Sequence, residues 1–460
     1  MVAYPMSRTP QQGVALVHGI AQAGLALAKE LRARGFTLVV SDDQPIDAKR
    51  AIADELGATF VAAPDRATLE RLVDGADMVC PAPGVPETHA LFEVAAQRGT
   101  PVRTEIDLAY EWEQQRPGGP RPILAITGTD GKTTTTLLAA HLLNHAGVKA
   151  AAVGNTEVPF VAAMHDDVDV FVVECSSFRL QFIESFRAEA SVWLNLAPDH
   201  QNWHRSMDSY EAAKARMWAH NRPTDVAIGF ATDPIVMRNL LALPGRTRTF
   251  AASGADYRIE AGTQLVGPAG LIAPINAMVR DLPHDRTNAL AAAALVLEAG
   301  LVPIDTIADA LATFRHPPHR IEPIGSLHGA RWFNDSKATT PHAALTAIRG
   351  FERVVLLAGG RNKGLDLTSL ATEAHRVKAV IGLGEAGGEV VQAFSGKCPT
   401  SAASSMQEAV AMAAAIAAEG DTVLLSPACA SFDWYPIGGY PARGSDFRQC
   451  FEAIAAKEGS

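Results

Sequence analysis

The sequence is poor in cysteine, and it has neither a long apolar run nor a basic cluster. No apolar run approaches the ~18 residues of a membrane-spanning helix, and the start Met1-Val-Ala-Tyr-Pro lacks the charged and apolar regions of a signal peptide. These absences predict a cytoplasmic protein without membrane insertion. The cysteines show no CxxC spacing and so predict neither a zinc site nor a disulfide framework. They are Cys80, Cys175, Cys398, Cys429 and Cys450.

The charge balance excludes another class of protein. The formal net charge is −10, and no basic stripe interleaved with aromatic residues occurs, which argues against nucleic-acid binding. At 460 residues the chain is long enough for about three domains of ~150 residues each. With 48% hydrophobic and 20% charged residues, the composition is typical of a soluble α/β enzyme. We expect a monomer that acts on small molecules.

Short apolar runs alternate with helical patterns over residues 14–112, which predicts βαβ units and a parallel sheet. The first turn, Gly19-Ile-Ala-Gln-Ala-Gly24, resembles a Rossmann fingerprint without its second glycine. Asp42 and Asp43 follow about twenty residues later, where a carboxylate suits a ribose hydroxyl. The predicted strands are 14–17, 37–41, 59–62, 78–80 and 102–103, and the predicted helices are 23–34, 48–56, 66–72 and 89–97.

Two segments rich in proline divide the rest of the chain. The run Gln115-Arg-Pro-Gly-Gly-Pro-Arg-Pro122 breaks both helix and strand, and His316-Pro-Pro-His319 marks a second boundary. We therefore predict domains over 1–115, 116–316 and 317–460. The middle domain is expected to contain strands at 123–126, 168–175, 190–196 and 225–230, with helices at 288–299 and 306–314. The last is expected to contain strands at 331–333, 354–358, 379–382 and 422–425 and a helix at 405–418.

The run Pro122-Ile-Leu-Ala-Ile-Thr-Gly-Thr-Asp-Gly-Lys-Thr-Thr134 is the most informative segment. An apolar strand, a glycine-punctuated loop and a helix suit a nucleoside triphosphate, because loop amides and the helix N-terminus face the phosphates. Lys132 neutralises phosphate charge and the Thr133 hydroxyl can bind Mg²⁺. The first glycine of the usual pattern is replaced by Ile126. A threonine-rich turn that merely caps a helix is the alternative.

Three further positions carry chemistry, each with an ordinary alternative. Glu174 ends an apolar strand and can deliver a carboxylate to Mg²⁺, or it is a solvated strand-end residue. His200 follows another apolar segment and can bind a second metal, or it is a polar loop residue. Lys214 lies on a helical segment, where a lysine is by default a solvated charge.

Polar loops follow three predicted strands of the last domain. They contain Asp335 and Lys337, then Lys363, then Ser431. Because the carboxyl ends of parallel strands meet at one edge of a sheet, we expect these loops to converge on a small charged substrate.

Taken together, the segments closely resemble the Mur ligases of peptidoglycan synthesis. The likeness covers essentially the whole chain. Its segments, in order, are Gly128-Thr-Asp-Gly-Lys-Thr-Thr134, Glu174-Cys-Ser-Ser-Phe, Asn195 to His200, Tyr210 to Lys214, Asn288-Ala-Leu-Ala, His319-Arg320, Asn334-Asp-Ser-Lys and Leu425-Ser-Pro-Ala-Cys-Ala-Ser.

The resemblance implies an α/β chain of three domains: a Rossmann-like domain for a uridine nucleotide precursor, a P-loop ATPase-like domain and a Rossmann-like domain for glutamate. It implies an ADP-forming ligase that adds D-glutamate to UDP-N-acetylmuramoyl-L-alanine through an acyl phosphate. A homologue that adds L-glutamate to the same precursor is the main alternative. ATP and two Mg²⁺ ions are the expected cofactors.

The resemblance also implies roles for individual residues. The expected catalytic residues are Lys132, Glu174, His200 and Lys214. One Mg²⁺ is assigned to Thr133 and Glu174, and the other to His200 and to Lys214 in carbamylated form. ATP contacts are expected at Thr129, Asp130, Gly131, Lys132, Thr133, Thr134, Thr135, Asn288, Arg320 and Asp335. Precursor contacts are expected at Gln22, Ala23, Asp42, Gly84 and Asn155, and glutamate contacts at Lys337, Thr339, Lys363, Ser431 and Tyr440.

The chain departs from the family pattern at a few positions. Asp130, Asp285 and Thr340 each stand where asparagine is expected, and the loop between Ser431 and Arg443 is about two residues longer than the family pattern. Three alternative functions remain: a folylpolyglutamate synthase, a dinucleotide-dependent oxidoreductase and a catalytically silent nucleotide-binding regulator. The P loop argues against the second, and the presence of all four expected catalytic residues argues against the third.

Overall fold

The computed structural model describes residues 12–44 and 47–458, in two compact units. The start of the chain, which the signal-peptide argument used, lies outside the described residues. Unit 1 contains Met1–Leu196, Asn202–Val279 and Thr287–Phe314, and unit 2 contains Ala197–Gln201, Arg280–Arg286 and Arg315–Ser460. The predicted domain boundaries remain predictions.

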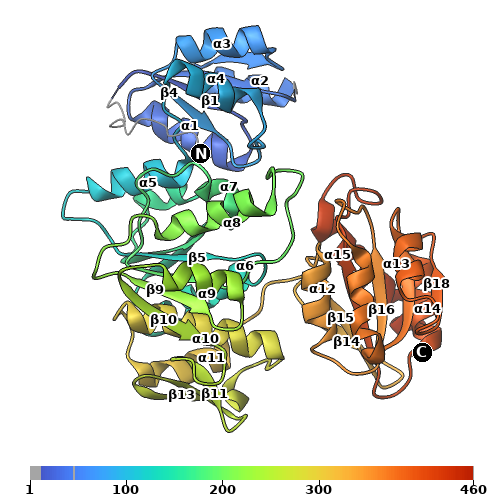
Figure 1. Cartoon of the computed structure of the whole chain (residues 1–460). Helices are drawn as coiled ribbons and strands as arrows, with labels where there is room; N and C mark the ends of the chain where they lie inside the picture. The colour runs from blue at the N-terminus through green and yellow to red at the C-terminus, as the bar shows by residue number, and fades with distance from the viewer. Residues whose placement is uncertain (1–11, 45–46, 459–460) are drawn as a thin grey trace. The chain divides into compact units, whose positions relative to one another are not determined.

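The first sheet is four-stranded and parallel, as the alternating pattern predicts. Its order is β3-β2-β1-β4, and Figure 1 shows its helices in blue.

Gly24 lies in the first helix, where a Cβ atom would come within 2.0 Å of the Gly19 carbonyl oxygen, so this close contact requires glycine. The predicted strand at 102–103 is wrong, because Val102 forms only an isolated bridge with Val79. The elements are β1 (Val14–His18), α1 (Gln22–Ala33), β2 (Thr37–Asp42), α2 (Asp47–Glu55), β3 (Thr59–Ala62), α3 (Arg66–Asp74), β4 (Met78–Pro81) and α4 (Ala90–Arg98).

The second sheet of unit 1 has six parallel strands in the order β10-β9-β8-β5-β7-β6. Its strands are β5 (Ile123–Thr127), β6 (Ala150–Gly154), β7 (Val170–Glu174), β8 (Ala190–Trp193), β9 (Val226–Phe230) and β10 (Arg246–Phe250). The accompanying helices are α5 (Glu105–Gln114), α6 (Lys132–His145), α7 (Ser177–Leu180), α8 (Met207–Ala215), α9 (Pro234–Leu241), α10 (Pro283–Glu298) and α11 (Ile307–Thr313). A small antiparallel sheet of β11 (Arg258–Glu260), β12 (Gln264–Gly267) and β13 (Gly270–Pro274) lies beside α11 (Figure 1).

Unit 2 contains a six-stranded sheet in the order β14-β15-β19-β16-β17-β18, parallel except for the β14–β15 hairpin. Separate apolar clusters fill its two faces, one under α12 and α13 and the other under α14 and α15. The strands are β14 (Glu322–Leu327), β15 (Ala330–Asn334), β16 (Val354–Gly359), β17 (Val377–Leu383), β18 (Thr400–Ala402) and β19 (Thr422–Ala428). The helices are α12 (Pro341–Ile348), α13 (Gly387–Ala393), α14 (Met406–Ile416) and α15 (Gly439–Glu458), with a 3-10 segment at Leu367–Arg376.

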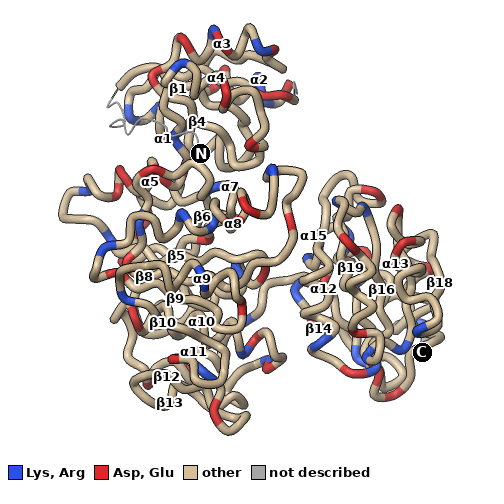
Figure 2. Tube along the Cα trace, viewed as in Figure 1, with Lys and Arg blue, Asp and Glu red and all other residues tan. Residues whose placement is uncertain are grey.

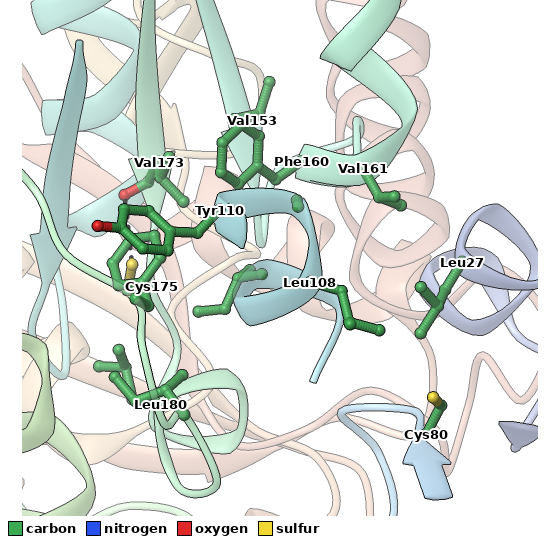
Figure 3. Packing of buried hydrophobic residues seen from close by; sticks show 14 of the residues in the cluster. Leu27, Cys80, Leu108, Tyr110, Val153, Phe160, Val161, Val173, Cys175 and Leu180 are labelled. Carbon is green, nitrogen blue, oxygen red and sulfur yellow. Dashed lines mark hydrogen bonds between the residues drawn. The ribbon is translucent and has the colours of Figure 1, made fainter. Parts of the chain in front are cut away.

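One apolar cluster runs through both larger sheets of unit 1. Figure 3 shows Leu27 and Cys80 of the first sheet layer, Leu108 and Tyr110 of α5, and Val173 of the second sheet within this cluster. Helix α5 is therefore the packing link between the two sheets. Burial of such side chains stabilises a fold by roughly 25 cal/mol per Å² of apolar surface.

Charged residues of both signs are dispersed over the molecule. Along α3, for example, Arg66 and Arg71 alternate with Glu70 and Asp74 (Figure 2). Among the described residues, no helix combines the length and the hydropathy that crossing a membrane requires.

Candidate active site

The phosphate loop forms where buried β5 meets α6. Gly131 precedes the helix with φ +83°, a backbone conformation that favours glycine. The side chain of Asn195 shapes the loop, because its Oδ1 accepts the N–H groups of Thr129 and Asp130, both at 2.9 Å. The sequence placed Asn195 in a motif, but its bonds to the loop were not predicted.

Lys132 opens α6 and turns back over the loop. Its Nζ donates to the carbonyl oxygens of Gly128 at 2.8 Å and Thr129 at 2.7 Å. Thr133 follows in the first turn of the helix, so the ammonium group and a hydroxyl lie at the helix N-terminus. This combination suits an anion such as a phosphate.

Glu174 ends β7 next to the loop-bearing strand β5. Its side chain is 1% exposed, and its Oε1 accepts from Asn155 Nδ2 at 3.0 Å. Within the described part of the chain, its Oε2 is buried and has no hydrogen-bond partner. A buried carboxylate oxygen without a hydrogen-bond partner, next to a threonine-rich loop, is suited to bind Mg²⁺. The structure therefore brings Glu174 together with Asn155, the expected precursor contact.

Lys214 is also buried, at 1% exposure, and it is not the solvated charge of the default interpretation. Its Nζ donates to the Gly128 carbonyl oxygen at 2.7 Å and lies 4.7 Å from the ring centre of Tyr210. The Tyr210 hydroxyl lies 3.1 Å from the hydroxyl of Thr129. Helix α8 thus contacts the phosphate loop through two side chains.

Asn288 lies on α10, against the first turn of α6. Its Oδ1 accepts from the Thr135 hydroxyl at 3.3 Å, and a Cβ atom on Gly131 would come within 2.8 Å of the same oxygen. The expected ATP contact at Asn288 is therefore adjacent to the phosphate loop.

His200 and Lys363 meet at Asp199 in unit 2. The His200 Nε2 lies 3.2 Å from one oxygen of Asp199, and the Lys363 Nζ lies 3.7 Å from the other. His200 has φ +56°, a left-handed conformation that is uncommon outside glycine. The residues expected as a metal ligand and as a glutamate contact are therefore neighbours here.

The loops that hold other expected glutamate contacts are joined by Arg443, which the sequence analysis did not single out. Arg443 is 2% exposed and donates to the carbonyl oxygens of Ser336, Cys429 and Ala430 and to the Ser336 hydroxyl. It therefore joins the loop after β15 to the loop after β19, where Ser431 is buried. Burial lowers the pKa of Arg443 to about 10, so the guanidinium remains charged at neutral pH.

Asp335 occupies the end of the same hydrogen-bonded loop. Its carboxylate accepts from the Ser426 hydroxyl at 2.7 Å and from the Ile321 N–H at 3.2 Å. Burial raises the pKa of Asp335 to about 7. The Thr340 hydroxyl accepts the N–H of Ala343 at 3.2 Å, so Thr340 in place of asparagine serves as the N-cap of α12. The neighbouring Thr339 is half-buried.

Apart from Asn155, which follows β6, the residues expected to bind the precursor lie at the carboxyl ends of β1, β2 and β4. Burial works to raise the pKa of Asp42, but hydrogen bonds from Lys49, Ile20 and Gln44 lower it overall. Gly84 is exposed, and a Cβ atom there would meet nothing within 4 Å. Ala23 and Gln22 begin α1, and the Gln22 amide donates to the Glu157 carbonyl oxygen near Asn155.

A His–Asp–His group beside this site was not predicted. Asp43 lies 3.5 Å from His18 Nε2 and 3.3 Å from His89 Nε2. Because His89 Nδ1 accepts the N–H of Leu91, the ring proton of His89 lies on Nε2, the nitrogen nearest to Asp43. A protonated ring nitrogen cannot bind a metal ion, so we assign no metal to this trio.

Comparison with known proteins decides the family. The model of the Mur ligase middle domain matches residues 126–296, and that of the Mur ligase glutamate ligase domain matches residues 319–429. A relative from Frankia casuarinae is 38% identical over 96% of this chain and 94% of its own, and one from Chlamydia caviae is 36% identical over 94% and 96%. Both are called UDP-N-acetylmuramoylalanine–D-glutamate ligase. The chain belongs to the Mur ligase family.

Solved structures agree with a Mur ligase fold. The MurF ligase of Thermotoga maritima, in complex with ADP, gives a TM-score of 0.62 at 15% identity, over 92% of this chain and 96% of that one. A pseudomurein peptide ligase type C of Methanothermus fervidus gives 0.60 at 17% identity, over 96% and 100%. The three-domain α/β architecture is therefore confirmed. As a Mur ligase, the chain is an ATP-dependent amide-bond-forming enzyme, and ATP is generally used with Mg²⁺.

Proposed function

We propose that this Mur ligase adds D-glutamate to UDP-N-acetylmuramoyl-L-alanine. The observation that carries the proposal is a sequence identity of 36–38%, over nearly the whole chain, to relatives called UDP-N-acetylmuramoylalanine–D-glutamate ligase. The expected glutamate contacts support it, because Lys337 lies against Tyr440 and Arg443 joins the loop of Lys337 to the loop that contains Ser431. The two expected lysines, Lys337 and Lys363, suit the two carboxylates of glutamate.

The reaction proceeds in two steps. The L-alanyl carboxylate attacks the γ-phosphorus of ATP, which forms an acyl phosphate and releases ADP. The amine of glutamate then attacks the acyl carbon, and the tetrahedral intermediate collapses to the amide and phosphate. The first step brings two anions together, so Lys132 and the loop amides stabilise the transferring phosphoryl group.

Mg²⁺ supplies further screening of this charge when it is bound. Thr133 and the unpartnered oxygen of Glu174 would hold one ion. A carbamylated Lys214 would help to hold a second. Carbamylation replaces a buried ammonium with an anion, which a Lys214→Arg variant cannot reproduce. We expect that variant to lose activity, and activity of the unmodified protein to depend on bicarbonate. Full activity of Lys214→Arg would contradict the carbamylation proposal.

Phosphate release tests the substrate assignment. It is measured with ATP, Mg²⁺ and UDP-N-acetylmuramoyl-L-alanine, in the presence of D-glutamate, L-glutamate or no amino acid. Dependence on D-glutamate is the expected result. Preference for L-glutamate would transfer the chain to the alternative ligase, and release with neither amino acid would remove the support for both.

A further inference from the structure

A buried carboxylate joins the first sheet layer of unit 1 to the loop before α8. Glu87 lies between β4 and α4 and is 6% exposed. Its Oε2 lies 3.3 Å from His204 Nδ1. Its Oε1 accepts the N–H of Arg205 and the hydroxyl of Ser209, the latter at 3.0 Å. Three donors from one segment therefore converge on a single side chain of another.

These contacts fix the proton on His204. A carboxylate only accepts, so His204 Nδ1 must carry a proton, and the neutral ring then accepts through Nε2. The Ser177 hydroxyl lies 2.9 Å from Nε2 and is the matching donor. Burial lowers the pKa of His204, which favours the neutral ring. Ser177, His204 and Glu87 have the order of a hydrolase triad, but Ser177 is 1% exposed and inaccessible as a nucleophile.

A second contact holds the segment that contains Gly84. The Trp203 Nε1 donates to the Pro83 carbonyl oxygen at 3.1 Å, and its ring lies 4.6 Å from that of Phe178. Gly84, the expected contact to the precursor, is the next residue after Pro83. A displacement of this loop would therefore move the hydrogen-bond partners of both Trp203 and His204.

The network continues to the phosphate loop. The rings of His204 and Tyr210 lie 5.1 Å apart, and the Tyr210 hydroxyl lies 3.1 Å from that of Thr129. Ser209, which donates to Glu87, also completes the capping box that starts α8. Glu87 thus sets the first turn of the helix that carries Tyr210.

We propose that Glu87 is a positioning residue that couples occupancy of the precursor loop at residues 82–89 to the phosphate loop through His204 and Tyr210. The inference rests on the proposed function, because it takes the precursor as the ligand of that loop. Binding of the precursor and of nucleotide are then linked, and each raises the affinity for the other by the same factor. The relay is the physical connection between the two sites.

The Glu87→Gln variant tests the coupling. The Gln oxygen must face the two donors Arg205 and Ser209, which leaves its NH₂ group facing His204 Nδ1. We expect the ring proton to move to Nε2, which ¹⁵N NMR of the histidine rings detects without any substrate. Glu93→Gln is the matched control, because Glu93 lies on the exposed face of α4 and pairs with Arg66.

The decisive measurement is the Kd of a non-hydrolysable ATP analogue with and without saturating UDP-N-acetylmuramoyl-L-alanine. We expect the precursor to tighten nucleotide binding by a factor in the range of about 5 to 150 in the wild type and in Glu93→Gln. The factor should fall to about 2 or less in Glu87→Gln, below the usual range of coupling. Tyr210→Phe removes the link to Thr129 without changing the ring, so it should lose the coupling while the His204 tautomer stays as in the wild type.

The outcomes are distinguishable. Coupling that persists in both Glu87→Gln and Tyr210→Phe, with the precursor bound, would overturn the role of Glu87 and leave the proposed function intact. An unchanged His204 tautomer in Glu87→Gln would also overturn the relay. Failure of the wild type to bind the precursor would overturn the proposed function, and the coupling with it.

Discussion

The ammonium group of Lys337 lies 4.0 Å from the ring centre of Tyr440. The two residues are far apart in the sequence, one in the turn after β15 and the other at the start of α15. The loop before Tyr440 is longer than the family pattern predicts, so the role of Tyr440 could not be read securely from spacing. The contact with Lys337 supports the assignment of both residues to the glutamate pocket.

This contact predicts a difference between two substitutions of Tyr440. Tyr440→Phe keeps the ring that faces the ammonium group, whereas Tyr440→Ala removes it. We expect Tyr440→Ala to raise KM for glutamate about tenfold, within the range of a partly desolvated cation–π contact. Tyr440→Phe should stay within about twofold of the wild type. Steady-state kinetics at saturating ATP and precursor would check this, and equal KM values for the two variants would exclude the contact from glutamate binding.

Lys132→Ala should abolish phosphate release without unfolding the protein. The Nζ of Lys132 donates to the loop carbonyl oxygens of Gly128 and Thr129, so its charge lies at the loop that is expected to bind the phosphates. A loss of about 10³-fold in kcat is expected for removal of a group that stabilises the transition state. Lys149→Ala is the matched control, because Lys149 is exposed and pairs with Asp167. Near-normal turnover of Lys132→Ala would remove the ATPase assignment.

Glu174→Gln should weaken Mg²⁺ binding. The amide can still accept from Asn155, but the position of the unpartnered Oε2 then loses its negative charge. We expect the Mg²⁺ concentration for half-maximal activity to rise at least about tenfold, as for other disrupted metal sites. The measurement is phosphate release over a Mg²⁺ titration. An unchanged midpoint would show that Glu174 holds no metal.

Asp335 makes stability depend on pH. Burial raises its pKa to about 7 in the folded protein, against about 3.9 in an unfolded chain. The folded state therefore binds this proton more tightly, and the contribution of Asp335 to stability, full below pH ~4, is lost as the pH rises through ~7. An Asp335→Asn variant has no such titration. We expect the difference between its urea unfolding midpoint and that of the wild type to increase from pH 5 to pH 8. A difference that stays constant over this range would contradict the raised pKa of Asp335.

The sequence predicts the parallel sheets well, because apolar strands and amphipathic helices are local patterns. It fails where local signals are weak. Strand β14 pairs antiparallel with β15 across an irregularity at Pro323–Gly325, and none of its residues is buried. Helix α10 begins at Pro283, ahead of the predicted start at 288, because proline is favoured in the first turn of a helix.

The candidate site shows the same division. Lys132 and Glu174 could be predicted because a strand, a loop and a helix present them in a fixed order. Glu87 and Arg443 could not, because each acts through partners that lie far away in the sequence. Lys214 shows why the family resemblance was needed: nothing in its helical surroundings indicates that its ammonium group is buried against Gly128.

Helix α5 has a consequence for how this chain can be recombined with others. Asp107 on α5 accepts the N–H groups of Glu184, Ser185 and Phe186, and its neighbour Glu105 pairs with Arg179. The helix is therefore bonded to the connection between β7 and β8 of the second sheet, although it follows the first sheet in the sequence. A chimaera that exchanges the first sheet and its helices should therefore have its junction before Thr104. With a junction at residue 115, α5 would come from the other protein, and its buried Glu105 and Asp107 would lose their native partners.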